Sequence, residues 1–195
     1  NTVSLNAEPK DGYAFVKWTI EEPGGLVADS LLTEKSLTFS MPRGDVRINA
    51  EFAKIYTVKF KIKDGQSAYG SLRGELVQEV LAGNSTTVVE AVPNENYAFI
   101  RWVDSGNRLI SENARFANTA VFEDETYTAM FADVWTVTFM NGDLVFKSIE
   151  VKNGDSAHIT EVPTKYGYVF TGWDKNLNNI TSDIFTYAQY VPRIH

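Results

Sequence analysis

The residues that could carry out chemistry are few in this sequence. It has 195 residues, two histidines and no cysteine. His158 lies in Ser156-Ala-His-Ile-Thr160, where alternation places Ala157 and Ile159 inward and His158 on the solvent side. His195 is the last residue. A serine or threonine nucleophile needs a neighbouring base, and the scattered hydroxyls do not form such a pattern. The sequence therefore indicates no nucleophilic catalytic centre.

Carboxylates offer a second kind of chemistry. Asp104-Ser-Gly-Asn107 and Asp124-Glu125 could supply oxygen ligands, but neither has the spacing of a calcium loop with its terminal glutamate. A turn and a solvated loop are predicted there instead. A glycosidase pair of carboxylates needs a concave pocket, which small repeat modules rarely enclose. We expect no catalytic residue, no metal ligand and no cofactor.

The clearest pattern is a signature that occurs three times. It reads Ala7-Glu-Pro-Lys-Asp-Gly-Tyr-Ala-Phe-Val-Lys-Trp18, then Ala91-Val-Pro-Asn-Glu-Asn-Tyr-Ala-Phe-Ile-Arg-Trp102, then Val162-Pro-Thr-Lys-Tyr-Gly-Tyr-Val-Phe-Thr-Gly-Trp173. Each copy also closes alike, in Asn49-Ala-Glu-Phe52, Thr128-Ala-Met-Phe131 and Tyr187-Ala-Gln-Tyr190. What recurs in every copy is what builds the unit. The sequence thus assigns these residues to the core: Tyr13, Phe15, Trp18, Phe52, Tyr97, Phe99, Trp102, Phe131, Tyr168, Phe170, Trp173 and Tyr190.

The repeats divide the chain into three modules, 1–53, 54–132 and 133–191, followed by a tail, 192–195. Two modules open alike, with Tyr56-Thr-Val-Lys-Phe60 and Trp135-Thr-Val-Thr-Phe139. The first module lacks this opening segment, so we expect a fragment of a longer array. Modules this small are marginally stable, and without disulfides each must rely on its aromatic core and its neighbours.

The local pattern predicts a mainly β protein. In Tyr56-Thr-Val-Lys-Phe-Lys-Ile-Lys63 apolar and polar side chains alternate strictly, which indicates a half-buried strand. No segment of ten or more residues has an amphipathic 3.6-residue period. One helical turn near residues 163–166 is the exception that we expect. The fold class is therefore a tandem array of three antiparallel-sheet repeats.

The array should also be elongated. Only Ala53-Lys-Ile55 and Ala132-Asp-Val134 separate a closing strand from the next opening one. Three residues reach about 10 Å, too little for free reorientation, and neither segment has the composition of a flexible linker.

The signature contains a geometric problem. Tyr13 and Phe15 share one strand face, whereas Trp18, three residues further on, would point to the other. Either a β-bulge after Phe15 returns Trp18 to the core, which Gly172 would ease in the third copy, or the tryptophan covers a second layer. The residue before each signature tyrosine should adopt positive φ. Gly12, Asn96 and Gly167 hold that place, and their residue types tolerate this conformation.

Charge and hydropathy limit the partners. The net charge is −7, and no basic stripe is present, which argues against nucleic acid. No apolar run approaches the ~20 residues of a membrane span. We expect a monomer without membrane insertion in this fragment. The loops Glu21–Gly25 and Asp104–Asn107 follow the same strand end in two copies, and a binding role would reside there.

These motifs resemble a known family. The third module, from Trp135-Thr-Val-Thr-Phe139 to Tyr187-Ala-Gln-Tyr190, looks like a Listeria-Bacteroides repeat, the internalin-type B-repeat. The first two modules are similar to the divergent branch of that family. The resemblance implies small β-grasp-like modules in secreted or surface-anchored bacterial proteins, serving as stalks or accessory adhesion modules. Two features depart from the usual form: Tyr190 stands where it ends in tryptophan, and the second module has an insertion around residues 67–74.

Two functions remain as hypotheses. The first is a non-catalytic repeat region that acts as a semi-rigid spacer or stalk with an accessory adhesion role. The second is a glycan- or protein-binding module appended to an adhesin or secreted enzyme, using non-repeated aromatic residues such as Tyr69, Tyr166 or Trp135. Coplanar clustering of these rings on one face would favour glycan binding, and scatter would favour the spacer. The expected partners are adjacent repeats and a cell-surface protein or glycan.

Overall fold

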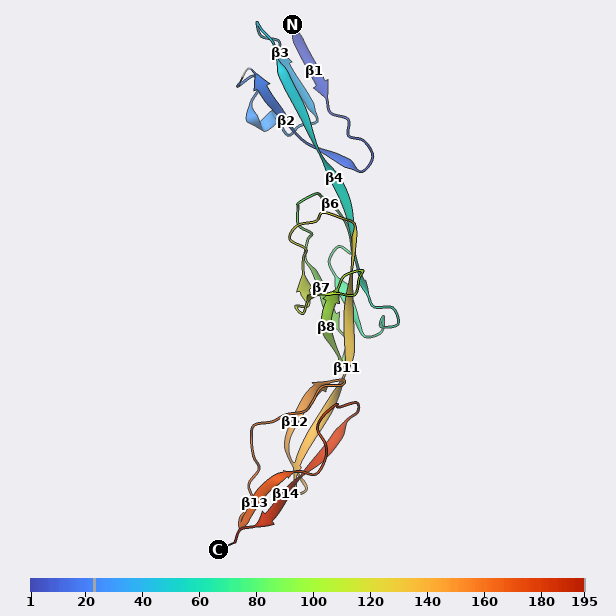
Figure 1. The fold of residues 1–195 in the computed structure, drawn as a ribbon, viewed down its shortest axis with the longest axis vertical. Coiled ribbons are helices and arrows are strands. Elements are labelled where there is room, and N and C mark those ends of the chain that lie inside the picture. The colour runs from blue at the N-terminus through green and yellow to red at the C-terminus, as the bar shows by residue number, and fades with distance from the viewer. Residues whose placement is uncertain (23, 195) are drawn as a thin grey trace. The chain divides into compact units, whose positions relative to one another are not determined.

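The computed structural model describes residues 1–22 and 24–194. The protein is mainly β, with 53% of its residues in strands and 2% in helix, as the sequence predicted. The strands, drawn in Figure 1, are β1 Thr2–Asn6, β2 Tyr13–Glu22, β3 Ser36–Ser40, β4 Arg47–Ile62, β5 Gly70–Arg73, β6 Val77–Leu81, β7 Val89–Pro93, β8 Tyr97–Val103, β9 Leu109–Ser111, β10 Arg115–Phe116, β11 Glu125–Asn141, β12 Leu144–Lys152, β13 Tyr168–Trp173 and β14 Ile184–Pro192. Within the described residues the one helical turn is the 3₁₀ turn Asp29–Leu31, so the turn expected near residues 163–166 is not helical.

The chain forms two compact units. One comprises Asn1–Phe60, Gly74–Val89 and Ala117–Tyr127. The other comprises Lys61–Arg73, Glu90–Phe116 and Thr128–His195. The division passes through the second repeat, and the three-module boundaries therefore stay a prediction.

In the first unit, β2 pairs antiparallel with β4, and β1 pairs antiparallel with β3. Leu37 and Phe39 project from β3 into a core that also contains Ala7 and Trp18. β6 lies antiparallel to β4, with Tyr56 opposite Val80. The core of this unit therefore joins the signature tryptophan to apolar residues of β3.

In the second unit, β11 is the central strand. It pairs antiparallel with β8 along its first half and with β12 along its second half. β14 then lies parallel to β11, with Val137 opposite Ile184, and β13 pairs antiparallel with β14. The sheet of the third repeat is thus mixed, not purely antiparallel as predicted, because the long segment between β11 and β14 allows a crossover connection. The alternation of side chains in the sequence does not distinguish parallel from antiparallel pairing.

Two long strands contain the segments that were expected to connect the repeats. β4 runs without interruption through Ala53–Ile55, and β11 runs through Ala132–Val134. In the first, Ile55 N–H donates to Gly12 O at 2.8 Å and Ala82 N–H donates to Lys54 O at 2.8 Å. The connecting backbone is therefore held on both of its edges.

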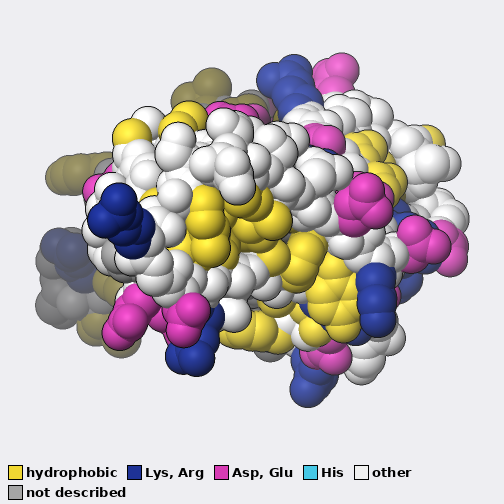
Figure 2. Space-filling model, turned by 90° about the horizontal axis from the view of Figure 1, so that it is seen from above, with side chains coloured by type: hydrophobic (Ala, Val, Ile, Leu, Met, Phe, Trp, Pro, Cys, Tyr) yellow, Lys and Arg dark blue, Asp and Glu magenta, His cyan; other side chains and the backbone are white. Residues whose placement is uncertain are grey.

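Charged side chains of both signs are mixed on the one face of the protein that Figure 2 draws. Figure 2 shows Lys and Arg next to Asp and Glu around apolar side chains on the face in view. No helix among residues 1–22 and 24–194 is long and apolar enough to cross a membrane.

Candidate functional site

The three signatures build the same group of rings in each copy. The tryptophan packs near the signature phenylalanine, with ring centroids 5.2 Å apart for Phe15 and Trp18, 5.9 Å for Phe99 and Trp102, and 5.3 Å for Phe170 and Trp173. The same phenylalanine meets the closing aromatic residue edge to face. These centroid distances are 5.9 Å to Phe52, 6.0 Å to Phe131 and 6.0 Å to Tyr190. Edge-to-face packing of this kind is favourable beyond the area it buries.

A β-bulge resolves the spacing of the signature. Phe15 lies opposite Phe52 and Lys17 lies opposite Glu51, so Val16 is the extra residue. The same shift occurs between Phe99 and Arg101, and between Phe170 and Gly172. Of the two alternatives considered, the bulge is therefore correct, because an extra residue returns the tryptophan to the inward face.

The turn before each signature tyrosine also repeats. Gly12, Asn96 and Gly167 have φ values of 78°, 66° and 75°, which confirms the expected positive φ. Each turn closes with a backbone hydrogen bond between residues three positions apart in the sequence, such as Tyr13 N–H to Lys10 O at 3.0 Å. Glycine and asparagine are the residues that adopt this conformation at low cost.

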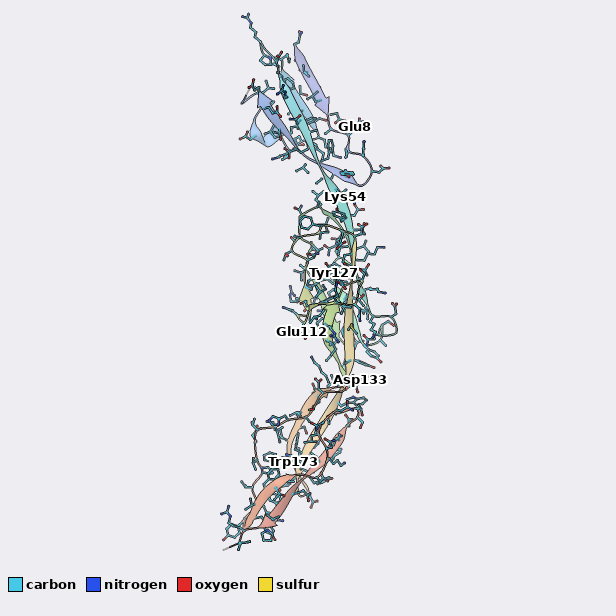
Figure 3. All side chains as sticks on the ribbon, in the orientation of Figure 1. Glu8, Lys54, Glu112, Tyr127, Asp133 and Trp173 are labelled. Atoms are coloured by element: carbon cyan, nitrogen blue, oxygen red, sulfur yellow. The ribbon has the colours of Figure 1, made fainter. Side chains whose placement is uncertain are left out.

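The twelve signature residues differ in burial. Trp18, Trp102 and Phe131 are buried. Phe15, Tyr97, Phe99, Phe170, Trp173 and Tyr190 are half-buried. Trp173, labelled in Figure 3, lies among the strands of the third repeat, with its ring centroid 4.8 Å from that of Phe139.

Three of the twelve lie at the surface, which corrects the core assignment for them. Tyr13, Phe52 and Tyr168 are 45%, 41% and 38% exposed. Tyr13 and Tyr168 are the first residues of their strands, and Phe52 lines an open hollow together with Tyr13. Few side chains remain beyond a strand end to cover a ring. In the third copy Lys165 partly does so, with its ammonium 4.4 Å from the Tyr168 ring centroid.

The non-repeated aromatic residues do not form one platform. Tyr69 stacks on the repeated Tyr97 at 4.2 Å, and Tyr97 and Trp135 line one shallow hollow. Tyr166 is fully exposed and lines a different hollow with Lys165. The three residues named in the binding hypothesis therefore share no ring contact with one another in the described part of the chain.

Two carboxylates singled out in the sequence anchor loops through hydrogen bonds. Asp104 is buried and accepts hydrogen bonds from Arg108 N–H at 2.9 Å and from Arg108 Nε at 2.6 Å. The Arg108 backbone N–H, followed by its guanidinium, lowers the pKa of Asp104 against the opposing effect of burial. The residues 104–107 thus form a turn, as predicted. Asp124 accepts a hydrogen bond from Thr57 N–H at 2.8 Å, which ties the loop that contains Asp124 to β4.

Two further carboxylates have lowered pKa values. The Tyr187 backbone N–H, together with the Thr186 hydroxyl, lowers the pKa of Asp174. The hydrogen bond from the Lys147 ammonium lowers the pKa of Glu161 to about 2. Both groups stay ionised at neutral pH, so neither can act as a general acid there.

The two histidines are the remaining candidates from the sequence. His158 is exposed, as its position in the alternation predicted, and His195 lies outside the described residues. Among the described residues, no group of three or more His, Cys, Asp or Glu side chains could hold a metal ion.

Sequence reasoning missed one side chain that supports the second copy. Gln66 Nε2 donates to Phe131 O at 2.7 Å, and Phe131 N–H donates to Gln66 Oε1 at 2.9 Å. The amide thus pairs with the backbone as a neighbouring strand would, immediately beside the bulge. The insertion that follows it supplies β5 and Tyr69. In the sequence, the only indication of the pairing between Gln66 and Phe131 is that the insertion at residues 67–74 follows Gln66 directly.

Comparison with known families agrees with these observations. Residues 1–56 and 61–135 match the divergent InlB B-repeat domain, and residues 135–192 match the Listeria-Bacteroides repeat domain. The chain is therefore a tandem β-rich repeat region. It belongs to the divergent InlB B-repeat family, with a Listeria-Bacteroides repeat as its last module, which confirms the resemblance. No curated protein matches the chain. Membership of these families indicates a non-catalytic repeat region of a bacterial surface protein.

Proposed function

We propose that this chain is a semi-rigid spacer in a bacterial cell-surface or secreted protein, with an accessory adhesion role. The observation that carries the proposal is the uninterrupted course of β4 and β11 through Ala53–Ile55 and Ala132–Val134. A connection that is itself a hydrogen-bonded strand cannot rotate freely, unlike a Gly/Ser linker.

The backbone hydrogen bonds at the second connection support this role. Val134 N–H donates to Asn96 O at 2.9 Å, on the side of the preceding repeat. Asn153 N–H donates to Asp133 O at 2.8 Å, on the side of the following repeat. Bending the connection would break bonds on one side or the other. A stiff connection suits a stalk that holds a distal domain away from the cell wall.

Small-angle scattering on the 195-residue chain tests the spacer. Three globules of ~25 Å in a row give a maximum dimension of roughly 75 Å. Replacing Ala53–Ile55 with a Gly/Ser segment of equal length should broaden the distance distribution, because the hydrogen-bonded strand is lost there. A maximum dimension near ~50 Å, the size of one compact domain of this length, would refute the spacer.

A binding module is the second candidate, and one sheet face favours it. On β14, Phe185 and Tyr187 are 53% and 42% exposed and lie two residues apart on the same side. On β13, Val169 lies opposite Val191 of β14 and is exposed as well. A glycan array probed with the wild-type chain and with a Phe185→Ser, Tyr187→Ser variant tests this function. Binding that survives the double substitution would exclude this face.

A further inference from the structure

The second and third repeats begin with equivalent four-residue segments whose chemistry differs. It is Lys54-Ile-Tyr-Thr57 on β4 and Asp133-Val-Trp-Thr136 on β11. Lys54 lies opposite Tyr13, and Asp133 lies opposite Tyr97. The two segments therefore place their first residue beside the same signature tyrosine.

Hydrogen bonds confirm that the two surroundings are equivalent. Thr57 N–H donates to Asp124 Oδ1 at 2.8 Å, and Thr136 N–H donates to Asp183 Oδ1 at 2.8 Å. Ile55 N–H donates to Gly12 O. In the same way, Val134 N–H donates to Asn96 O. Each segment thus has an aromatic ring, a signature tyrosine and an aspartate at the same relative positions.

In the first segment the chain supplies its own cation. The Lys54 ammonium lies 4.6 Å from the centroid of the Tyr56 ring. This distance is within the range of a cation–π interaction. The backbone arrangement therefore accommodates an alkylammonium group over the ring at this position.

In the second segment that cation is replaced by an acid. Asp133 stands where the first segment has lysine, and Trp135 stands where it has tyrosine. These two residues, with Tyr97, Asn96, Thr136 and Asp183, line a hollow of about 380 Å³. Figure 3 labels Asp133 near the start of the third repeat. Within the described residues, neither Asp133 nor Asp183 forms an ion pair.

The walls of this hollow are held in place. The Trp135 indole N–H donates to Asn153 Oδ1 at 2.8 Å, which fixes one edge of the ring. Asp183 is fixed by its bond from Thr136 N–H. Tyr97 is supported by its stacking on Tyr69. Preorganised groups of this kind lose little entropy when a ligand binds.

We propose that the hollow binds the ε-ammonium group of a lysine side chain presented by a partner protein. Tryptophan is the best aromatic partner for a cation, and two carboxylates add Coulomb attraction. A lysine is favoured over other cations because Lys54 occupies the equivalent position in the same chain. The proposal does not depend on the spacer function, since a flexible array would contain the same hollow.

NMR titration of the ¹⁵N-labelled 195-residue chain tests the proposal. The probe is the peptide acetyl-Gly-Lys-Gly-amide, and its matched control carries norleucine, which keeps the alkyl chain without the charge. The lysine peptide should shift the Trp135 indole N–H signal saturably with a dissociation constant on the order of 1 mM, and salt should weaken it by screening. The signal is assigned by its loss in Trp135→Phe.

Two substitutions distinguish the hollow from general attraction to an acidic protein. Asp133→Lys introduces the cation of the first segment and should weaken binding by at least about tenfold. Asp183→Asn keeps the Oδ1 acceptor for Thr136 but removes the charge, and should weaken binding about threefold to tenfold. Asp143→Asn, at an exposed turn elsewhere in the third repeat, is the control and should leave binding unchanged.

Three results would overturn the proposal. They are equal binding of the norleucine peptide, unchanged binding by Asp133→Lys, and no saturable shift of the indole signal up to ~10 mM peptide. If Asp133→Lys alters the fold, as a changed amide spectrum would reveal, Asp133→Asn replaces it. Unchanged binding in both Asp133→Asn and Asp183→Asn would equally exclude the hollow.

Discussion

Replacing Trp102 with alanine should remove most of the stability of the second repeat. Its side chain has no exposed surface, and its ring lies 5.9 Å from Phe99 and 6.0 Å from Phe116. Its indole N–H also donates to Ala114 O at 3.2 Å. The side chain therefore contributes packing and a hydrogen bond to the same core.

The magnitude follows from the buried area. An aromatic side chain buries 150 to 250 Å², which at about 25 cal/mol per Å² corresponds to roughly 4 to 6 kcal/mol, and residual burial in the unfolded chain reduces this. A loss of about 3 to 5 kcal/mol is typical of Trp→Ala in a core. Small domains have total stabilities of only about 5 to 15 kcal/mol. The variant should consequently be unfolded in part near physiological temperature.

Thermal unfolding followed by circular dichroism measures this effect. A loss of this size lowers the melting temperature by well over ~10 °C in a domain of 60 to 100 residues. Trp102→Phe retains most of the ring area and should lose much less. Trp135→Ala is the matched control for tryptophan removal, because Trp135 is only half-buried. A shift of a degree or two in Trp102→Ala would show that this residue does not support the core.

Three further results are expected. Gly70→Ala should destabilise the chain by about 1 to 3 kcal/mol in urea unfolding, because a Cβ there would lie 2.6 Å from Phe131 Cε1. Gly24→Ala is the control and should be neutral, because the space around Gly24 is open. Asn96→Ala should cost about 1 to 2 kcal/mol because alanine tolerates φ of 66° poorly, and Asn96→Gly should not; equal midpoints for both would contradict this reason. The pKa of Glu161 is lowered from 4.5 to about 2 in the folded protein, so its stabilising effect is complete above about pH 4.5 and is lost as the pH falls toward 2. The Glu161→Gln variant should therefore lose less stability than the wild type between pH 7 and pH 3. Equal losses in the two proteins would exclude the Lys147–Glu161 ion pair as a contributor.

The elements that the sequence predicted well are those with a local cause. Positive φ at Gly12 follows from its residue type and its place before a strand. The alternation from Tyr56 to Lys63 predicted a strand, and β4 contains most of that segment. The bulge at Val16 was one of two alternatives, because spacing alone shows a conflict of faces without showing how the backbone resolves it.

The elements that the sequence did not predict depend on contacts between distant residues. The parallel pairing of β11 with β14 places Val137 opposite Ile184, with β12 and β13 between them in the chain. The alternation of side chains is the same for a parallel and an antiparallel strand. Phe52 is exposed and lines an open hollow with Tyr13, although its residue type is the same as that of the buried Phe131. A repeated residue therefore predicts a repeated position, while its burial also depends on what the neighbouring, non-repeated segments cover.

The equal length of the two connecting segments has a structural reason. Successive strand residues point to opposite faces, so residues separated by an even number share a face. Phe52 and Phe60 are related in this way on β4, and Phe131 and Phe139 are related in this way on β11. One strand thus carries the closing ring of one repeat and the core ring of the next on a single face. A single inserted residue between them would turn one of the two rings to the opposite face, because a one-residue slip reverses every side chain beyond it. Connecting segments of three residues therefore keep the two rings of each strand on one face, and an insertion of one residue would not.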